Sequence, residues 1–320
     1  MDARSIERRR VIGTAIAVVL ISAGIGFFGH VVFGANVSSS VVVTATAPTM
    51  GTVTVNGGNN ITLSPGGTVT VPVTAQVNDY NGCADFSSGT TTVALWYSVA
   101  GSSTCISGGT PGNENTCYVA AAFTTSTCSG SIANTTTTFN MQYFAKATDA
   151  SSSVPSSNWR ATVIFKAPSG STTSADSASG TTPDVLTLLA FNLSTSTINY
   201  GNVGAGGNTA SLDPTVNVQN YGNSTDGSYL YGTAMLNAAS STLSMPTSSQ
   251  LYATSTFNAG SAGTPLSDVA TTQISGFSLT APTTISIVSS SVYWGLSVPG
   301  GTPTGTYNAT NTFSALFVSS

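Results

Sequence analysis

The four cysteines carry the most definite chemistry in this chain, and they lie within one stretch of 46 residues. Where a chain is exported, an even number of cysteines is typical of disulfide bonds. Of the three possible pairings we favour the one that joins sequence neighbours, Cys83–Cys105 with Cys117–Cys128, and the sequence leaves the other two open. A zinc site is disfavoured, because gaps of 21, 11 and 10 residues lack the close paired spacing of zinc ligands.

Oxygen-bearing side chains gather in one loop, where they could bind a hard cation. Asp79, Asn81 and Asp85 are close in sequence, and Asp149 ends a segment that we predict to return beside them. Calcium prefers carboxylate and amide oxygens, so these four residues form a candidate calcium site. The alternative is that Asp and Asn cap local turns. A second, looser set of the same kind is Asp213, Asn223 and Asp226.

Residues for catalysis are scarce. The only histidine, His30, lies in an apolar N-terminal segment, which excludes Ser–His–Asp and Cys–His arrangements from the rest of the chain. Glycosidase chemistry needs two carboxylates, and nine acidic residues follow Ala35. However, Glu114 is the only glutamate among them, and its PGNEN sequence is typical of a turn. We therefore predict no catalytic residues, no enzyme activity, and no cofactor other than the candidate calcium.

The N-terminus has the pattern of an export signal. Arg4 and three arginines at positions 8–10 precede the uncharged segment Val11–Ala35. As a helix, these 25 residues would measure about 37 Å, which exceeds the roughly 30 Å of bilayer hydrocarbon. We predict a signal or membrane-anchor helix over residues 1–35 with a cytoplasmic N-terminus, and we favour retention over cleavage near Ala35. The rest of the chain would then lie at the cell surface or be secreted.

The composition after the leader indicates an all-β exported protein. Over the whole chain 40% of residues are hydrophobic and only 6% are charged, and mean hydropathy is +0.21. Such a chain is too apolar to be disordered, and Ser and Thr alternating with Val favour antiparallel sheets. Three basic residues oppose nine acidic ones after Ala35. This balance excludes nucleic acid as a partner and disfavours an anionic lipid surface.

Turn-forming stretches divide the chain into segments. Residues 36–50 are predicted to be a linker that contains a short edge strand, SVVVTAT at 40–46. Alternating apolar residues predict a β-sandwich over 51–167 and a second one over 183–320, whose strands include Ser196–Tyr200. Residues 168–182 hold only small and turn-forming residues, so we predict a flexible Ser/Gly-rich linker.

Several sequence segments resemble modules of exported cell-surface proteins. VNDYNGCADF, NTCYVAAAF and YFAKATDASSSVPSSNWRATVIFKA are similar to an immunoglobulin-like surface module found in uncharacterised proteins of environmental microbes. INYGNVGAGG, VNVQNYGNS and YWGLSVPGGTPTGTYNATNTFSA resemble another recurring exported β module. The resemblance implies two tandem β-sandwich domains of immunoglobulin-like type and a surface location, and it implies no activity.

Together these features predict a non-enzymatic cell-surface protein with a structural or adhesive role. Its expected partners are other cell-surface proteins or surface glycans, with possible self-association, and the membrane through its N-terminal helix. One alternative is a pilus-like filament subunit in which the strand near 41–46 of one copy completes the sheet of the next. Another alternative is an exported carbohydrate-active hydrolase.

Overall fold

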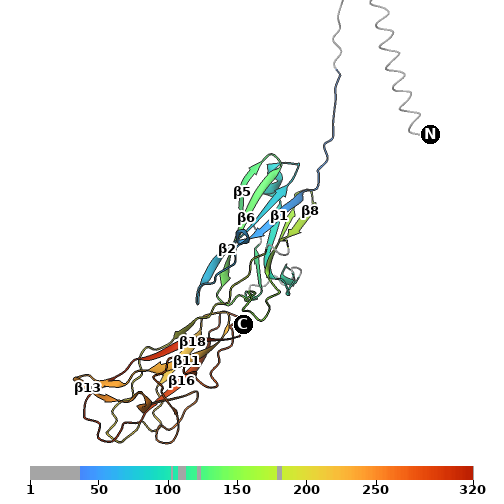
Figure 1. Cartoon of the computed structure of the whole chain (residues 1–320). Helices are drawn as coiled ribbons and strands as arrows, with labels where there is room; N and C mark the ends of the chain where they lie inside the picture. Colours follow the sequence, from blue (N-terminus) through green and yellow to red (C-terminus); the bar gives the residue numbers. More distant parts are fainter. Residues whose placement is uncertain (1–36, 102–103, 107–112, 121–123, 179–181, 320) are drawn as a thin grey trace, which may run out of the picture. The chain divides into compact units, whose positions relative to one another are not determined.

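The structure is a computed structural model that describes residues 37–101, 104–106, 113–120, 124–178 and 182–319 (Figure 1). Antiparallel strands dominate these residues, which confirms the predicted β-rich class. The predicted leader at 1–35 lies outside the described residues. In the described part of the chain, no helix has the length and apolar character needed to cross a bilayer. The chain divides into a unit that ends at Thr44 and a unit from Ala45 onward, and all of the sheets lie in the second unit.

Two four-stranded antiparallel sheets, blue to yellow-green in Figure 1, form the first half of this unit. The first sheet has the order β1-β2-β6-β5: β1 Thr49–Val55, β2 Thr68–Asn78, β6 Ile132–Gln142 and β5 Thr124–Ser129. The second sheet has the order β4-β3-β7-β8: β4 Cys117–Ala120, β3 Thr90–Tyr97, β7 Trp159–Lys166 and β8 Thr172–Asp176.

Both sheets contribute side chains to one hydrophobic cluster, the first core. In β2, the buried residues Val71, Val73 and Ala75 alternate with more exposed neighbours, which is the period of a strand with one buried face. Leu95 of β3 and Trp159 of β7 meet them from the second sheet. The apolar alternation predicted from the sequence therefore places the core correctly.

A short helix, α2 (Cys83–Ser88), connects β2 to β3. It buries Phe86 against Phe165 of β7, with ring centroids 5.4 Å apart. The helix ends at Gly89, where a Cβ atom would lie only 2.6 Å from the Phe165 ring and 2.8 Å from the Lys166 carbonyl oxygen. Glycine is required there because the chain passes against β7. Other helical elements in the described ranges are a helical turn at 104–106 and the 3₁₀ turns η1 (Asn56–Gly58) and η2 (Thr247–Ser249).

The prediction of a flexible linker over residues 168–182 is wrong for the central part of that segment. Residues Thr172–Asp176 form β8, which pairs with β7 from Thr162 to Lys166. Backbone hydrogen bonds hold an edge strand whose Thr and Ser side chains need little apolar burial, so small polar residues do not exclude a strand. The predicted domain boundary at 183 also differs, because Val185 is fully buried in the first core and bridges to Ile61.

The second core, orange to red in Figure 1, is built from three antiparallel sheets. The largest has the order β15-β14-β16-β10-β9: β15 Thr264–Pro265, β14 Gln250–Ala253, β16 Val288–Leu296, β10 Thr215–Asn220 and β9 Phe191–Leu193. β11 (Thr225–Gly232) pairs with β18 (Asn311–Ser319). The third sheet is β13-β12-β17: β13 Ser240–Met245, β12 Met235–Asn237 and β17 Tyr307–Asn308.

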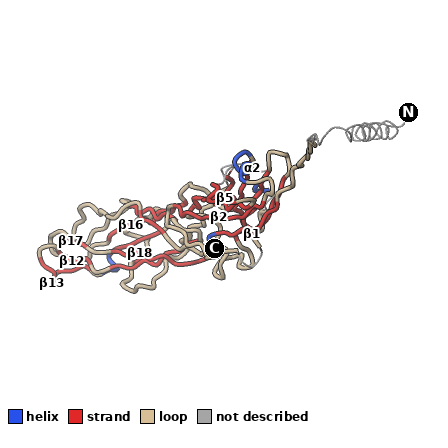
Figure 2. The backbone as a smooth tube through the Cα atoms, turned by 90° about the horizontal axis from the view of Figure 1, so that it is seen from above, coloured by secondary structure: helices blue, strands red, loops and turns tan. Residues whose placement is uncertain are grey.

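Trp294 of β16 is fully buried in the second core and lies edge-on to Phe313 of β18, with ring centroids 6.1 Å apart. Long loops, tan in Figure 2, connect these strands. The predicted strand at Ser196–Tyr200 is absent, because the chain turns there: Asn199 Oδ1 accepts a hydrogen bond from the Gly201 backbone N–H at 2.9 Å. Gly201 has φ of 70°, a conformation that glycine adopts without strain.

Candidate functional site: an uncharged cleft in the second core

A cleft of about 780 Å³ opens between the sheets of the second core. Its floor includes Val216 of β10 and Leu296 of β16, and Asn311 and Phe313 of β18 form part of one wall. The other wall is the irregular segment 193–205, which the turn at Asn199 prevents from pairing as a strand. The cleft is therefore a side opening of the second core, lined by residues from strands and loops.

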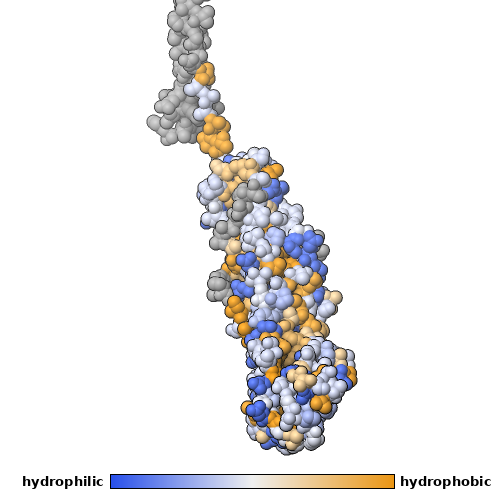
Figure 3. Space-filling view, turned by 90° about the vertical axis from the view of Figure 1, so that its left-hand side faces the viewer, coloured by the Kyte–Doolittle hydropathy of each residue, from blue (hydrophilic) through white to orange (hydrophobic). Residues whose placement is uncertain are grey.

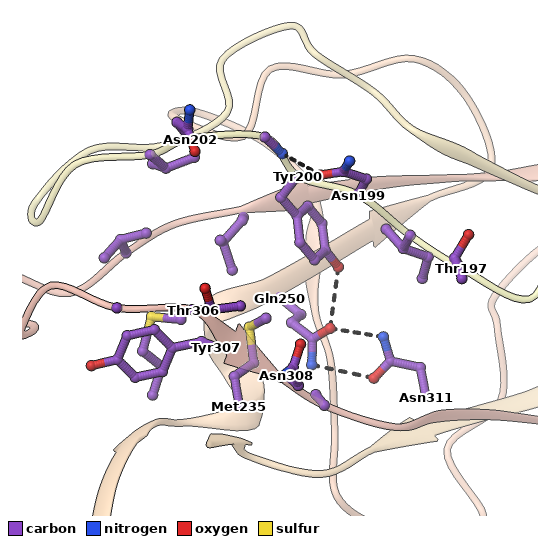
Figure 4. A pocket seen from close by; sticks show the side chains of 18 of the residues that line it. Thr197, Asn199, Tyr200, Asn202, Met235, Gln250, Thr306, Tyr307, Asn308 and Asn311 are labelled. Carbon is purple, nitrogen blue, oxygen red and sulfur yellow. Dashed lines mark hydrogen bonds between the residues drawn. The ribbon is translucent and has the colours of Figure 1, made fainter. Parts of the chain in front are cut away.

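Three side chains form a polar network at the cleft, in which Tyr200 and Gln250 are buried and Asn311 is partly buried (Figure 4). The Tyr200 hydroxyl donates a hydrogen bond to Gln250 Oε1 at 3.1 Å. Asn311 Nδ2 donates to the same oxygen at 2.7 Å, and Gln250 Nε2 donates to Asn311 Oδ1 at 3.2 Å. Burial raises the pKa of Tyr200, so its hydroxyl keeps its proton and remains a donor. The network fixes the amide of Gln250, whose side chain is only 1% exposed.

The lining of the cleft carries no formal charge. Its polar members are hydroxyl and amide side chains such as Thr197, Asn199 and Asn308, and its apolar members include Met235 and Met245. Hydroxyls and amides donate and accept hydrogen bonds to neutral groups, while the apolar side chains favour burial of an uncharged ligand. The arrangement is suited to binding a neutral partner and offers no carboxylate for acid–base chemistry at this place.

One edge of the cleft is an unpaired strand. β18 pairs with β11 along one side, and within the described ranges no strand pairs with its other side. Phe317 and Val318 of β18 remain 40% and 49% exposed. An unpaired edge presents free N–H and C=O groups, and it is a site where another chain can add.

The predicted calcium loop has a different role in the structure. Asp79 is fully buried, and its Oδ1 accepts hydrogen bonds from the backbone N–H of Asn81 at 2.9 Å and from Asn81 Nδ2 at 2.8 Å. Asn81 in turn accepts a hydrogen bond from the Thr46 N–H at 3.1 Å and donates one to the Thr46 C=O at 2.9 Å. Asp79 thus orients Asn81, and Asn81 holds the chain that leads into β1.

The four candidate calcium ligands do not come together. Asp85 lies in α2. Asp149 binds Thr187 instead: Thr187 Oγ1 donates to its Oδ1 at 2.6 Å, and the Thr187 N–H donates to its Oδ2 at 2.8 Å. Thr187 lies two residues after Val185, which is buried in the first core and bridges to Ile61, before the start of β2. Asp79, by contrast, directly follows Asn78, the last residue of β2. Across the described residues, no group of three or more His, Cys, Asp or Glu side chains could hold a metal ion.

The cysteines form two disulfides, as predicted, but the favoured pairing is wrong. The bonds are Cys83–Cys128 and Cys105–Cys117. Cys83 opens α2 and Cys128 lies in β5, so this bond joins the helix to the edge of the first sheet. Strand pairing brings residues distant in sequence to adjacent positions, and sequence proximity therefore does not decide the connectivity.

Asn223 lies where the two cores meet, a role that the sequence did not indicate. Its side chain is 3% exposed; Nδ2 donates to the carbonyls of Ala145 at 2.9 Å and Leu186 at 3.2 Å, and Oδ1 accepts from the Leu188 N–H at 2.6 Å. Beside it the rings of Tyr143 and Tyr221 stack with centroids 6.0 Å apart.

The other two members of the looser set also bind protein groups rather than one another. Asp213 Oδ2 accepts from the Phe257 N–H at 3.1 Å. Asp226 Oδ1 accepts from Ser224 Oγ at 2.8 Å, and burial raises the pKa of Asp226 from 3.8 to about 7 against the opposing effect of that bond. These residues therefore serve the structure of the second core.

No protein-family model matches the chain, and a search of curated proteins finds no match. Among solved structures, the chain is 10% identical to the CsuC–CsuE chaperone–tip adhesion subunit pre-assembly complex from archaic chaperone-usher Csu pili of Acinetobacter baumannii. That similarity covers 83% of this chain and 100% of that one, with a TM-score of 0.29. Red sea bream transglutaminase is 10% identical over 86% of this chain and 29% of its own, with a TM-score of 0.21. Escherichia coli alpha-2-macroglobulin is 10% identical over 82% of this chain and 22% of its own, with a TM-score of 0.22. At these TM-scores the similarities assign neither a family nor a function to this chain.

Proposed function

We propose that this chain is a non-enzymatic cell-surface protein with a structural or adhesive role, built from two immunoglobulin-like β-sandwiches that follow an N-terminal signal or anchor helix. In this proposal the two cores are the two sandwiches. The N-terminal helix carries them across the membrane, and the protein acts outside the cell on other surface proteins, surface glycans or further copies of itself.

The observation that carries this proposal is the uncharged cleft. A cavity of about 780 Å³ lined by hydroxyls, amides and apolar groups can hold a neutral partner. The two disulfides support an oxidising location outside the cytoplasm, since such bonds persist there.

Protease shaving of intact source cells tests the proposed location. Brief digestion of washed cells should release peptides from residues 45–320, and a cytosolic enzyme measured in the same supernatant controls for lysis. Recovery of these peptides only after lysis, together with four free thiols that react with a maleimide before any reductant is added, would contradict the proposal.

A second candidate, a pilus-like filament subunit assembled by strand donation, is favoured by one specific observation. Residues 37–47, which we call the N-terminal arm, lie outside every strand and are exposed throughout (Figure 3). An extended, exposed segment rich in Val and Thr is suited to pairing with an open sheet edge. No comparable observation favours a carbohydrate-active hydrolase.

A further inference from the structure

We propose that the N-terminal arm of one copy adds as a β-strand to the free edge of β18 in a second copy and places its apolar side chains in the cleft. The inference rests on the proposed structural role and names its partner, a second copy of this chain. It concerns an acceptor site made by β18, Gln250 and the floor residues Val216 and Leu296.

The arm has the side-chain pattern of a donor strand. Val41, Val42 and Val43 are 83%, 87% and 85% exposed, although Val is among the residues most often buried. Successive residues of a strand face opposite sides, so Val41, Val43 and Ala45 share one apolar face, whereas Ser40, Val42 and Thr44 lie on the other, mixed face. One face can therefore enter an apolar cleft while the other remains in solvent.

The acceptor matches this strand in length and charge. β18 contains nine residues with one unpaired side, and the arm supplies nine residues, 37–45, that lie in no strand and precede the held Thr46. Neither the arm nor the cleft lining contains a charged residue, so joining them leaves no charge buried without a partner. New backbone hydrogen bonds would satisfy both edges at once.

The arm cannot fill the cleft of its own chain. Asn81 holds Thr46 beside Asp79, at the end of β2 that is remote from the second core. At its other end, the turn before β2 contacts the second core, where the Gly66 N–H donates to the Tyr221 carbonyl at 3.0 Å. The eleven residues of β2 span about 36 Å, whereas residues 37–45 extend at most about 32 Å from Thr46.

Because donor and acceptor are different surfaces of one chain, each added copy exposes a new arm or a new cleft. Such a contact is heterologous and propagates head to tail instead of closing as a two-fold dimer. The expected products are open chains of copies whose length rises with protein concentration.

Paired cysteine substitutions in the full chain test the contact directly. The native cysteines are all in disulfides, so added thiols react only with each other. By strand alternation Ala315 and Phe317 lie on the same face of β18 as Phe313, which lines the cleft. Mild oxidation of detergent-solubilised V43C/A315C or V43C/F317C should give a covalent ladder, whereas V43C/S174C, which places the second thiol on the edge strand β8, should not.

A matched pair of charge substitutions tests the orientation of the strand. V43D should lower the assembly constant by at least about a hundredfold, because it places an unpaired carboxylate in the cleft. T44D, one residue further on the outward face, should assemble nearly as well as the unsubstituted chain. Both sites are exposed in the single chain, so both variants should keep the same melting temperature.

The inference would be overturned by no ladder from either cleft pair, by equal ladders from the β8 control, or by equal effects of V43D and T44D. Binding of a neutral oligosaccharide from a glucan, mannan and galactan panel, without any assembly, would assign the cleft to a glycan and also overturn it. None of these results would alter the protease-shaving test, so failure of the contact and failure of the surface role are distinguishable.

Discussion

Asn223 joins the two cores by three hydrogen bonds, and replacing it by Asp preserves its shape while removing its two donors. Nδ2 donates to the carbonyls of Ala145 and Leu186, and a carboxylate oxygen in the same position would face both carbonyls without a proton. Oδ1 would still accept from the Leu188 N–H. N223D therefore isolates the donor half of the contact.

The expected loss of stability follows from the burial of this site. Each buried carbonyl left without a donor costs about 1–3 kcal/mol, so two of them cost about 2–6 kcal/mol. The introduced carboxyl is buried beside two carbonyl oxygens, and both features raise its pKa in the folded state above the unfolded value. When protonated, the carboxyl can donate to one of the two carbonyls, so the loss should be smaller at low pH and should grow as the pH rises through the folded pKa.

Urea unfolding of the full chain at pH 5 and pH 8.5 measures this effect. N192D is the matched control, because Asn192 of β9 is exposed and the same exchange there should change stability by less than about 0.5 kcal/mol. If N223D unfolds within 0.5 kcal/mol of the unsubstituted chain at pH 8.5, or shows the same pH dependence as N192D, the role assigned to Asn223 is refuted.

Three further variants test other parts of the structure. Asp226 has a folded pKa of about 7 against 3.8 for the free side chain. Its contribution to the free energy of unfolding is therefore most favourable below about pH 4, and it falls by no more than about 4 kcal/mol as the pH rises through 7. D226N should flatten the dependence of stability on pH over that range, measured by thermal unfolding. Replacing Cys83 and Cys128 by Ser opens a loop with a sequence separation of 45 and should cost about 4 kcal/mol in denaturant unfolding. N81A should speed hydrogen exchange at the Thr46 amide while leaving the amides of β2 protected, and unchanged exchange at Thr46 would contradict the hold of Asn81 on the Thr46 backbone.

Alternating apolar residues made the first core predictable, because a strand that packs one face against a core carries apolar side chains at every second position. Val71 and Val73 of β2 are buried as the period requires, and Trp159 occupies the core between the sheets. The same rule fails for β8, since Thr172–Asp176 pairs through its backbone and buries little side chain. Apolar composition predicts which segments bury side chains. An edge strand such as β8 can form through backbone hydrogen bonds without burying many side chains, so its composition does not reveal it.

The candidate site was less predictable, because its parts meet only through the fold. Gln250 and Asn311 are far apart in sequence, and their paired amides are produced by the packing of β14 near β18. In the same way, Asp79 and Asn81 were correctly identified as neighbours in one loop, but the hydrogen bonds of Asn81 to the Thr46 backbone could not be read from the sequence. Side-chain type gave the hydrogen-bonding capacity, and only the tertiary contacts gave the partner.

A retained anchor and the proposed strand donation make opposite demands on the N-terminal arm. The arm begins two residues after Ala35, so an uncleaved leader would keep the arm of every copy beside the membrane. The acceptor cleft lies in the second core, beyond a first core whose β2 alone spans about 36 Å. Copies held in one membrane by uncleaved leaders would keep every arm at its surface, which favours separate surface molecules, whereas cleavage near Ala35 would free the arm to pair. The mature N-terminus, measured by mass spectrometry on fractions that assembled or stayed unassembled on the source cells, should therefore start near Asn36 in the assembled fraction, and an intact Met1 in that fraction would contradict the requirement for cleavage.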